Sequence, residues 1–384
     1  MNQTTVVRLG VIGLGNIAQQ HIENVTSGAA GRCQLTALCS RSPSELANKY
    51  EVQHFAKPLE LIQSGLCDAV LVATPTFNHC EVGLQVLEAG LHLMMEKPLG
   101  LSIAEGERLV RAQQDSQVFA LMLNQRTDPL FQAMHDCVAS NALGAITRTH
   151  WTMTHWFRPE IYYQASDWRA TWKGEGGGLL LNQCIHNLDI FQWLCGMPTS
   201  LRGFCQFGRY HDIEVEDEVT AYLEYENGAT GVFIGSTGEA PGVNQLDIIG
   251  DKGTLSFDGE HLSLKLNTPS TSEYSRSTRD MFGMPGVTVS DITPSRQVNQ
   301  HALVLANFAE AILDGAPLIA PAAEGLSSLA IANAMLLSTW ESREVSFPLA
   351  SEAYQQALNQ RLSESKLREK TMTEVNVDMS ASYR

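Results

Sequence analysis

Residues 6–18 read VVRLGVIGLGNIA, an apolar run followed by a glycine-rich turn and the start of a helical pattern. The run has no helical period, which is typical of a buried strand. In the turn, Gly13, Gly15, Asn16 and Ile17 belong to a G-x-G-x-x-A pattern, whose missing side chains let backbone amides approach a pyrophosphate. The stretch predicts a strand, a dinucleotide-binding turn and a helix; a purely structural tight turn is the alternative.

The same alternation of short apolar runs and helical stretches continues along the first third of the chain. We expect strands at about 35–40, 67–75, 91–98 and 118–126, and helices that start at Ser42 in Ser42-Pro43-Ser44-Glu45, run from about Phe77 to Gly90, and are capped by Ser102 with Glu105. Unbroken apolar strands between helices indicate a parallel sheet covered on both faces. Residues 1–125 are therefore predicted to form a doubly wound α/β Rossmann domain.

Longer strands and hairpin signals characterise the next part of the chain. Strands are expected at about 145–156, 201–210, 217–225, 229–237, 244–250 and 253–266, and helices at about 128–140, 298–314 and 322–341. Asn227-Gly228 and Asp251-Lys252-Gly253 are hairpin signals, because Asn and Gly accept a positive φ at low cost. We predict an α+β domain over residues 126–350 with a large open, mainly antiparallel sheet.

Two further segments carry no clear period. Residues 268–296 are rich in Ser, Thr, Arg and Pro, which predicts a long surface loop or a mobile lid. Residues 351–384 form a C-terminal segment whose polar end, from about residue 365, is expected to be loosely held.

Charge and composition favour a small-molecule partner. The 384 residues include 26 Lys+Arg against 42 Asp+Glu, which gives a net charge of -16. The sequence has no run of Lys and Arg that could bind along a phosphate backbone, so nucleic acid and anionic membranes are not expected partners. No leader or membrane-spanning run is recognised, so a soluble cytoplasmic protein is expected. The eight cysteines lie singly and the histidines do not cluster, which predicts reduced core thiols and no metal site.

The end of the second predicted strand bears on the choice of cofactor. It reads Cys39-Ser40-Arg41-Ser42 and lacks the acid that commonly binds the ribose 2'-hydroxyl of NAD. A small hydroxyl followed by Arg suits a 2'-phosphate, so Ser40 and Arg41 slightly favour NADP. NAD stays open because an arginine also stacks on adenine, and Arg41 is alternatively a solvated cation.

Three stretches resemble a known family: ATPTFNH at 73–79, MEKPL at 95–99 and GEGGGLLLNQCIHNLD at 174–189. Together they resemble the Gfo/Idh/MocA oxidoreductases, the group of glucose-fructose oxidoreductase and inositol dehydrogenase, over roughly residues 6–345. The resemblance implies a nicotinamide held by the first domain, with its reactive face towards a sugar or polyol on the open sheet of the second.

The resemblance also implies roles for individual residues. Lys97 and His186 match the catalytic lysine and histidine of the family, and Glu96 matches the residue beside the lysine. Further cofactor contacts implied by the matching positions are Thr74, Pro75, Asn78, His79, Trp168 and Arg169. Asn182 is a departure, because many members have Asp four residues before the histidine. An amide orients a hydroxyl but does not accept a proton, so an Asp-dependent proton relay is in doubt.

Reference pKa values suggest a different role for each of the two catalytic candidates. Histidine titrates near 6.5 and lysine near 10.4, so Lys97 would need a shift of about three units to act as a base at neutral pH. We therefore expect His186 to be the general base and Lys97 to bind the hydroxyl and stabilise developing alkoxide charge. A shared or reversed assignment stays open, because a positive nicotinamide also lowers the pKa of a neighbouring lysine. Asp189, one helical turn further on, supports His186 or belongs to the helix surface.

Aromatic and cationic residues crowd the segment before the glycine run. Among them, Arg158, Tyr163 and Trp172 are candidates for substrate binding beside Lys97, Asn182 and His186, since aromatic faces suit sugar rings; core packing is the alternative for the aromatics.

The sequence predicts an NAD(P)-dependent dehydrogenase or reductase that acts on a sugar, glycoside or cyclitol. An NAD-assisted glycoside hydrolase and a non-catalytic sugar-sensing regulator are the competing interpretations. The exposed face of a large antiparallel sheet is expected to be covered by another subunit, in a homodimer or homotetramer.

Overall fold

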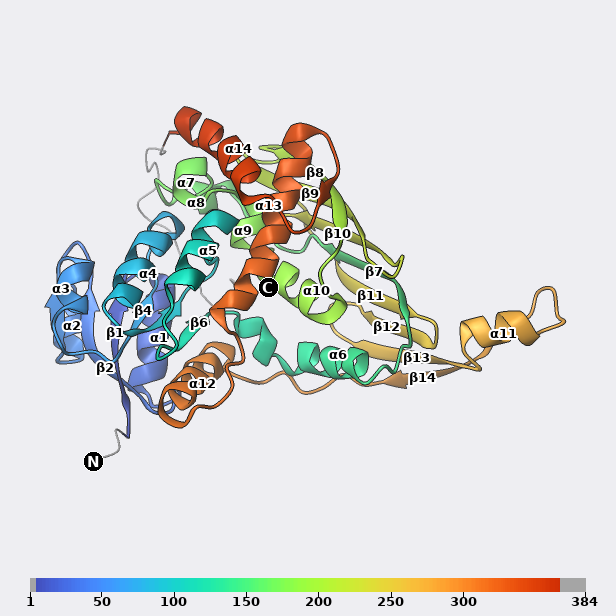
Figure 1. Cartoon of the computed structure of the whole chain (residues 1–384), viewed down its shortest axis with the longest axis horizontal. Helices are drawn as coiled ribbons and strands as arrows, with labels where there is room; N and C mark the ends of the chain where they lie inside the picture. Colours follow the sequence, from blue (N-terminus) through green and yellow to red (C-terminus); the bar gives the residue numbers. More distant parts are fainter. Residues whose placement is uncertain (1–4, 367–384) are drawn as a thin grey trace.

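The computed structural model describes residues 5–366 and contains two sheets, each with its own helices (Figure 1). The first sheet has six parallel strands in the order β3-β2-β1-β4-β5-β6. They are β1 (Val7–Ile12), β2 (Cys33–Cys39), β3 (Gln53–Phe55), β4 (Ala69–Val72), β5 (His92–Met95) and β6 (Phe119–Leu121). This order confirms the predicted Rossmann fold. The short edge strand β3 was not predicted, because its sequence QHF has no apolar run.

Helices cover both faces of the first sheet. They are α1 (Asn16–Thr26), α2 (Glu45–Lys49), α3 (Pro58–Ile62), α4 (His79–Glu88), which follows the 3-10 turn η1 (Thr76–Asn78), and α5 (Ile103–Ala112). Helices α4 and α5 belong to one apolar cluster, and α1 belongs to another on the opposite face. That second cluster also contains Val304, Leu305 and Phe308 of α12 (Gln300–Asp314). A helix from far along the chain therefore completes the core of the first sheet (Figure 1).

The capping predictions have different outcomes. Ser102 caps α5 as expected, since its hydroxyl accepts a hydrogen bond from the Glu105 amide at 3.4 Å. The predicted start at Ser42 was wrong: Ser44 is the N-cap of α2 and accepts from the Leu46 amide at 3.2 Å. The later start places Glu45 in the first turn, where a negative charge favours the positive end of the helix dipole.

The second sheet has nine strands in the order β14-β13-β12-β11-β7-β10-β9-β8-β15. They are β7 (Ile146–Met153), β8 (Ser200–Phe207), β9 (Glu216–Glu224), β10 (Thr230–Ser236), β11 (Asn244–Gly250), β12 (Gly253–Phe257), β13 (Leu262–Thr268), β14 (Gly286–Asp291) and β15 (Val345–Ser346). All neighbours are antiparallel except β7 and β10, which confirms a mainly antiparallel sheet. The single strand predicted over 253–266 is divided, because Asp258 accepts hydrogen bonds from the amides of Glu260 and His261 and forms a turn.

Helices cover one face of this sheet. They are α6 (Pro129–Ala139), α7 (Glu160–Gln164), α8 (Trp172–Glu175), α9 (Leu179–Asn182), α10 (Ile185–Cys195), α13 (Gly325–Glu341) and α14 (Ser351–Glu364), with 3-10 turns η2 (Asn124–Thr127) and η3 (Ala322–Glu324). Trp151 of β7 lies fully buried between Phe131 of α6 and Phe191 of α10. Within residues 5–366, no helix combines the length and the apolar character that a membrane crossing requires. The loose end expected from about residue 365 falls almost entirely outside the described residues.

Residues 268–296 do not form the predicted loop or lid. Ser270 caps a short helix, α11 (Thr271–Ser277), and β14 pairs with β13 in register from Ser263↔Asp291 to Thr268↔Gly286. Backbone pairing to the existing sheet edge orders this segment without an apolar pattern in its sequence. We call residues 269–291 the arm. It extends from the sheet edge well beyond the rest of the molecule (Figure 1).

Candidate active site

The glycine turn after β1 depends on the missing side chains of two glycines and leaves the start of α1 open. Gly13 has a φ of +92°, and a Cβ there would lie 2.5 Å from the carbonyl oxygen of Ala73 at the end of β4. Gly15 is the N-cap of α1, and a Cβ there would meet nothing within 4 Å, so the approach to the helix is open. Asn16 and Ile17 form the first turn of α1. The unpaired amides and the dipole of this helix suit an anion.

The end of β2 carries a hydroxyl and a cation but no carboxylate. The Ser40 hydroxyl donates to the Ser42 carbonyl oxygen at 2.6 Å and lies 2.9 Å from Nε2 of His54, a β3 residue that the sequence did not single out. Arg41 is exposed beside it. These are the groups on which the expected NADP preference depends.

Lys97 connects the two halves of the molecule. It follows β5 at the carboxyl edge of the first sheet, and its Nζ donates a hydrogen bond to the backbone oxygen of Asn182 in α9 at 2.8 Å. Burial lowers the pKa of Lys97 below its usual value of 10.5, although the carboxylates of Glu96 and Glu175 oppose this shift. At a given pH, a larger fraction of Lys97 is therefore neutral than of an exposed lysine.

His186 lies in the first turn of α10 and is 7% exposed. Burial lowers its pKa well below the usual value of 6.5, and the nearby positive charge of Lys97 lowers it further. Its Nδ1 has no hydrogen-bond partner among the described residues. The structure thus brings the two catalytic candidates together, with a neutral imidazole beside the lysine.

Asn182 belongs to a buried polar network that explains its amide. Its Nδ2 donates to Oε1 of Glu175, and its Oδ1 accepts from the Tyr162 hydroxyl at 3.3 Å. Tyr162 in turn accepts from Nη1 of Arg169 at 2.6 Å. Burial raises the pKa of Glu175, which the positive charge of Arg169 opposes. A carboxylate at 182 would face Glu175, a residue that the sequence analysis missed, so an amide suits this position.

Glu96 pairs with a histidine that the sequence analysis also missed. Nε2 of His21, on α1, lies 2.6 Å from Oε1 of Glu96, and both side chains are buried. The ring of His301, from α12, lies 5.5 Å from the His21 ring. Burial alone would raise the pKa of Glu96, but the His21 hydrogen bond and the charges of His21, His301 and Lys97 lower it to about 2. The carboxylate beside Lys97 is therefore ionised at neutral pH.

The segment that follows β4, residues 74–79, lies beside Lys97. Thr74, Pro75 and Asn78 are partly buried there. The ring of His79 lies between two carbonyl oxygens, 2.9 Å from that of Thr74 and 2.8 Å from that of Pro98. Both ring nitrogens are thus engaged with the backbone, so His79 connects the β4 and β5 segments.

Some of the remaining candidate residues from the sequence lie near Lys97, and others lie in the core. The Arg169 guanidinium lies 4.9 Å from the Trp168 ring centre, and both Arg169 and Arg158 are close enough to affect the pKa of Lys97. By contrast, the Tyr163 hydroxyl donates to Thr237 Oγ1 within the core, and Trp172 packs against Trp340 and Phe207. Asp189 does not support His186; it forms a buried ion pair with Arg126 at 2.7 Å.

A cavity of about 400 Å³ lies between the two halves, and His301 is part of its wall. Amide side chains from both domains predominate in its wall, which consists of Gln20, Asn124, Gln125, Asp128, Phe131, Met153, His155, Trp156, Asn187, Asn244, Phe257, Arg296, Val298, Asn299, Gln300 and His301. Among these, Gln20 Oε1, Asn124 Oδ1, Gln125 Oε1 and His155 Nδ1 are buried and find no hydrogen-bond partner within residues 5–366. Scattered single polar residues carry no sequence pattern, which is why the sequence did not reveal this wall.

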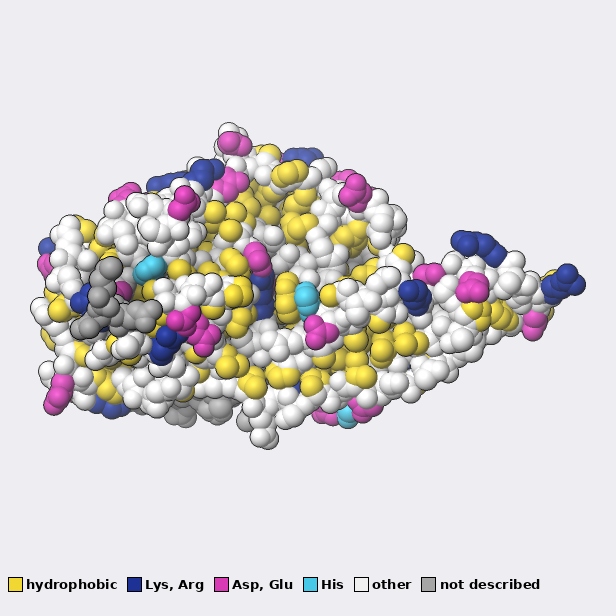
Figure 2. All heavy atoms as spheres, turned by 60° about the horizontal axis from the view of Figure 1, so that its bottom comes forward, with side chains coloured by type: hydrophobic (Ala, Val, Ile, Leu, Met, Phe, Trp, Pro, Cys, Tyr) yellow, Lys and Arg dark blue, Asp and Glu magenta, His cyan; other side chains and the backbone are white. Residues whose placement is uncertain are grey.

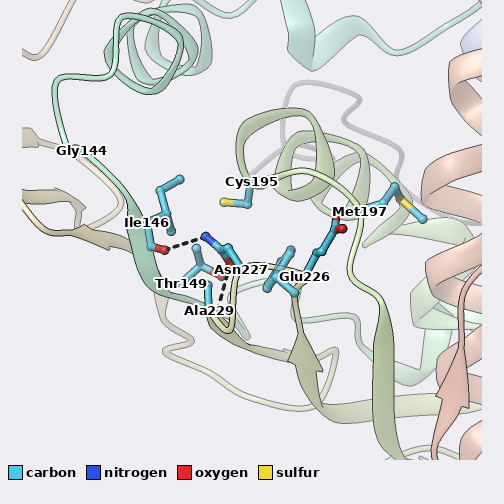
Figure 3. A pocket seen from close by; sticks show the side chains of 9 residues that line it. Gly144, Ile146, Thr149, Cys195, Met197, Glu226, Asn227 and Ala229 are labelled. Carbon is cyan, nitrogen blue, oxygen red and sulfur yellow. Dashed lines mark hydrogen bonds between the residues drawn. The ribbon is translucent and has the colours of Figure 1, made fainter.

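A second cavity, of about 480 Å³, lies at the other end of α10, below Cys195 and Met197 (Figure 3). Asn227 in its wall donates to the Ile146 carbonyl oxygen at 3.1 Å and serves the hairpin. Cys195 is nine residues after His186, or roughly 14 Å along a helix axis. This cavity is therefore separate from the site around Lys97. All eight cysteines lie in the described part of the chain and are free, and burial raises the pKa of Cys195 to about 12.

Comparison with known proteins agrees with this geometry. The family description "Oxidoreductase family, NAD-binding Rossmann fold" matches residues 7–124, and the Gfo/Idh/MocA C-terminal domain matches residues 131–256. An inositol 2-dehydrogenase of Rhizobium meliloti is 24% identical over 349 residues, which are 88% of this chain and 99% of that protein. A myo-inositol 2-dehydrogenase of Thermotoga maritima is 27% identical over 66% of this chain and 75% of its own length.

Solved structures share the fold. The WlbA dehydrogenase of Chromobacterium violaceum, in complex with NADH and UDP-GlcNAcA, has a TM-score of 0.77 and 25% identity over 90% of this chain and 97% of its own. A levoglucosan dehydrogenase in complex with NADH has a TM-score of 0.74 and 18% identity over 89% of this chain and 99% of its own, which shows the shared fold. Because both family models match it, this chain belongs to the Gfo/Idh/MocA family of NAD-binding oxidoreductases.

Proposed function

We propose that this enzyme transfers a hydride between NAD(P) and a CH–OH carbon of a small sugar, glycoside or cyclitol. The contact of Lys97 Nζ with Asn182, beside His186, supports this proposal most strongly, because it joins the cofactor domain to the second domain at one point. The adjoining cavity of about 400 Å³ has a wall rich in amides with unpaired oxygens, which suits a ligand with several hydroxyl groups. Relatives named inositol dehydrogenases agree with this substrate class.

The residues divide the chemistry between them. The bound nicotinamide supplies the hydride acceptor in the oxidative direction. His186, neutral at physiological pH, accepts the hydroxyl proton at a ring nitrogen, and Lys97 binds the same oxygen and stabilises its developing negative charge. Glu175 holds the Asn182 amide so that the Asn182 backbone oxygen meets Lys97. The reversed assignment, with Lys97 as the base, differs in its pH dependence.

The pH profile of kcat/KM tests which group is the base. A base must be unprotonated, so activity is lost as the pH falls through its pKa. Because the pKa of His186 lies well below 6.5, we expect constant activity from pH 7 upward to about pH 8.5 and an acidic limb below pH 6.5. An acidic limb above pH 7 that disappears in Lys97→Arg, which stays charged, would instead identify Lys97 as the base.

Substrate and cofactor are tested together by assaying sugars, glycosides and cyclitols with NAD and with NADP at the reduced-nicotinamide absorbance band. Stoichiometric formation of reduced cofactor is expected. Product release from a glycoside without net reduction would support the NAD-assisted glycoside hydrolase, and binding without turnover would support the sugar-sensing regulator.

We also propose a preference for NADP over NAD, carried by Ser40 and Arg41. Arg41→Ala is expected to raise the KM for NADP about 10- to 100-fold, the loss of one hydrogen bond to a charged group, and to leave the KM for NAD nearly unchanged. Arg108→Ala, on the distant helix α5, is the matched control. Equal effects of Arg41→Ala on both cofactors would contradict the preference.

The Asn182–Glu175 pair gives a further prediction. Asn182→Asp removes the donor to Glu175 and places two carboxylates together, so we expect about a tenfold loss of kcat/KM. Adding Glu175→Gln restores a donor and removes one charge, and the double variant is expected to recover most of the activity. Independent, additive losses would show that the two positions do not act as a pair.

The setting of the reaction is a separate proposal. Eight free thiols suit a reducing cytoplasm, and the acidic charge disfavours nucleic acid or anionic membranes as partners. The uncovered sheet face supports a homodimer or homotetramer.

A further inference from the structure

A fully buried carboxylate of the second domain, that of Glu216, has no part in the site described so far. Glu216 is the first residue of β9, and its exposed fraction is 0%. On the face of the molecule that Figure 2 shows, charged side chains lie scattered in small groups at the surface, so burial sets Glu216 apart from them. A carboxylate in the interior is costly unless hydrogen bonds satisfy its oxygens, so its partners indicate its role.

A bulge directs the Glu216 side chain towards the helices. Along the pair of strands β8 and β9, Gln206 lies opposite Glu218, and Phe207 lies opposite Glu216. Asp217 is therefore an extra residue in β9, and such a residue changes the side to which the next side chain points. Glu216 thus faces the helix-covered side of the sheet, where it meets α9.

Oε1 of Glu216 accepts two hydrogen bonds at the start of α9. The donors are the backbone amides of Gly178 and Leu180, both at 2.9 Å. The N-cap residue of α9 is Gly178, which has no side chain to accept from these amides. The carboxylate from β9 therefore takes the place of a capping side chain.

Glycines let the segment before α9 approach its neighbours. A Cβ at Gly178 would lie 2.2 Å from the backbone oxygen of Glu216. A Cβ at Gly174 would lie 1.9 Å from the backbone oxygen of Trp168. Both glycines thus pack against the backbone of this chain, which explains why the segment is rich in glycine. At Gly178, the close approach brings the helix start within reach of the Glu216 carboxylate.

The other end of α9 carries the contact with Lys97. The Asn182 backbone oxygen accepts from Lys97 Nζ at 2.8 Å, and His186 follows in the first turn of α10. Helix α9 has only four residues, or about 6 Å of helix. Because it is a single turn, a shift at its start moves the Asn182 oxygen and the beginning of α10 with it.

The contact of Glu216 with α9 depends on an acceptor oxygen more than on a negative charge. Burial raises the pKa of Glu216 to about 7, and the hydrogen bonds from the Leu180 and Gly178 amides oppose this shift. Its second oxygen, Oε2, is buried and has no hydrogen-bond partner within residues 5–366. A glutamine, which keeps one carbonyl oxygen and has no charge, is therefore a close substitute at this position.

We propose that Glu216 is a positioning residue of the active site: it holds the start of α9 and thereby fixes where the Asn182 backbone oxygen meets Lys97 and where His186 follows. Glu216 acts through α9 and not by contact with the substrate. Its effect on turnover rests on the proposed function, whereas the attachment of α9 is measurable without a substrate.

Hydrogen–deuterium exchange of the full chain measures the attachment of α9. Glu216→Leu removes the acceptor at similar size, and the amides of residues 178–182 are expected to exchange at least about tenfold faster. Glu216→Gln keeps an acceptor and is expected to stay within about threefold of the wild type. The matched control is Ser338→Ala, which removes another fully buried acceptor, that of the Gly203 amide on β8, and should leave residues 178–182 protected. Unchanged exchange in Glu216→Leu would overturn the proposal.

Steady-state kinetics measure the positioning. Glu216→Leu is expected to lower kcat about 10- to 100-fold, because a small displacement of catalytic groups has an effect of this size. The substrate KM and the cofactor Kd are expected to change by less than about threefold, since the lost interaction is not a binding contact. Glu216→Gln is expected to recover most of the turnover, and Ser338→Ala is expected to match the wild type. Faster exchange with an unchanged kcat would leave Glu216 a purely structural residue and would contradict the proposal.

Two further measurements decide the proposal if Glu216→Leu does not fold or if the wild type transfers no hydride. Glu216→Asp keeps the charge but withdraws the acceptor by one methylene, and its kcat is expected to lie between those of the Leu and Gln variants; full activity of the Asp variant with an inactive Gln variant would assign the effect to charge instead. A wild type without hydride transfer would refute the proposed function alone. The pH dependence of Lys97 acetylation by acetic anhydride then reports the pKa of Lys97, which is expected to rise towards 10.5 in Glu216→Leu or Glu216→Asp as burial decreases, but not in Glu216→Gln. An unchanged pKa in the Leu and Asp variants would refute the positioning role.

Discussion

Lys97→Met is expected to lower kcat at least about 1000-fold, because the variant loses the only charge that contacts the reacting oxygen in the proposed site. The Lys97 ammonium is partly buried and is held in place by the Asn182 carbonyl oxygen. Cofactor affinity is expected to change by less than about threefold, since in the proposed site the glycine turn and the residues after β4 would hold most of the dinucleotide. Steady-state kinetics and cofactor fluorescence measure the two quantities separately.

The control for this variant is Lys173→Met, which removes an exposed lysine from the same region. It is expected to retain full activity. Near-normal turnover of Lys97→Met would remove Lys97 from the reaction, and an equally large loss of cofactor affinity would limit it to cofactor binding.

His21→Leu is expected to lower the free energy of unfolding by about 3–5 kcal/mol, because it leaves a buried carboxylate without its hydrogen-bonded partner. Glu96 is 7% exposed and His21 is fully buried, so water cannot replace the lost contact. His21→Gln keeps a donor within reach of Glu96 and is expected to lose less. His261→Leu, whose side chain is 63% exposed, is the surface control and is expected to be nearly neutral. Urea unfolding measures these differences.

The same pair predicts an acid dependence of stability. The folded pKa of Glu96 is about 2, below its usual value of 4.5, so its stabilising contribution is complete above pH 4.5 and is lost as the pH falls through 2. This contribution is about 3 kcal/mol at neutral pH. Glu96→Gln has no such titration, and its free energy of unfolding is expected to vary less between pH 5 and pH 2.5. An equally steep loss in the variant would contradict the assignment.

Local patterns were sufficient for most of the fold. The run VVRLGVI and the turn at Gly13 predict β1 and α1, because strand, glycine turn and helix follow each other directly in the sequence. Asn227-Gly228 predicts the turn between β9 and β10 for the same local reason. The edge strand β3 and the arm were missed or misassigned, because their backbones are ordered by pairing with strands that already exist rather than by an apolar period.

Sequence motifs likewise predicted some residues of the candidate site but not others. Lys97 and His186 were found through motifs, and the structure brings them together. His21, Glu175 and His301 were missed, because each matters only through a partner far away in the sequence: His21 lies 75 residues from Glu96. Tyr163 and Trp172 were candidates for sugar stacking, but a list of aromatic residues does not show which ones pack on Thr237 or Trp340 instead.

The position of helix α12 in the sequence has a consequence for folding during synthesis. Val304, Leu305 and Phe308, which seal the apolar side of the first sheet, are made about 180 residues after that sheet is complete. At about 5–20 residues per second, the ribosome needs roughly 10–35 seconds to deliver them. Throughout that interval the apolar cluster around Val7, Leu9 and Val11 is covered by α1 but lacks α12, so nascent chains are expected to bind chaperones that shield apolar surfaces.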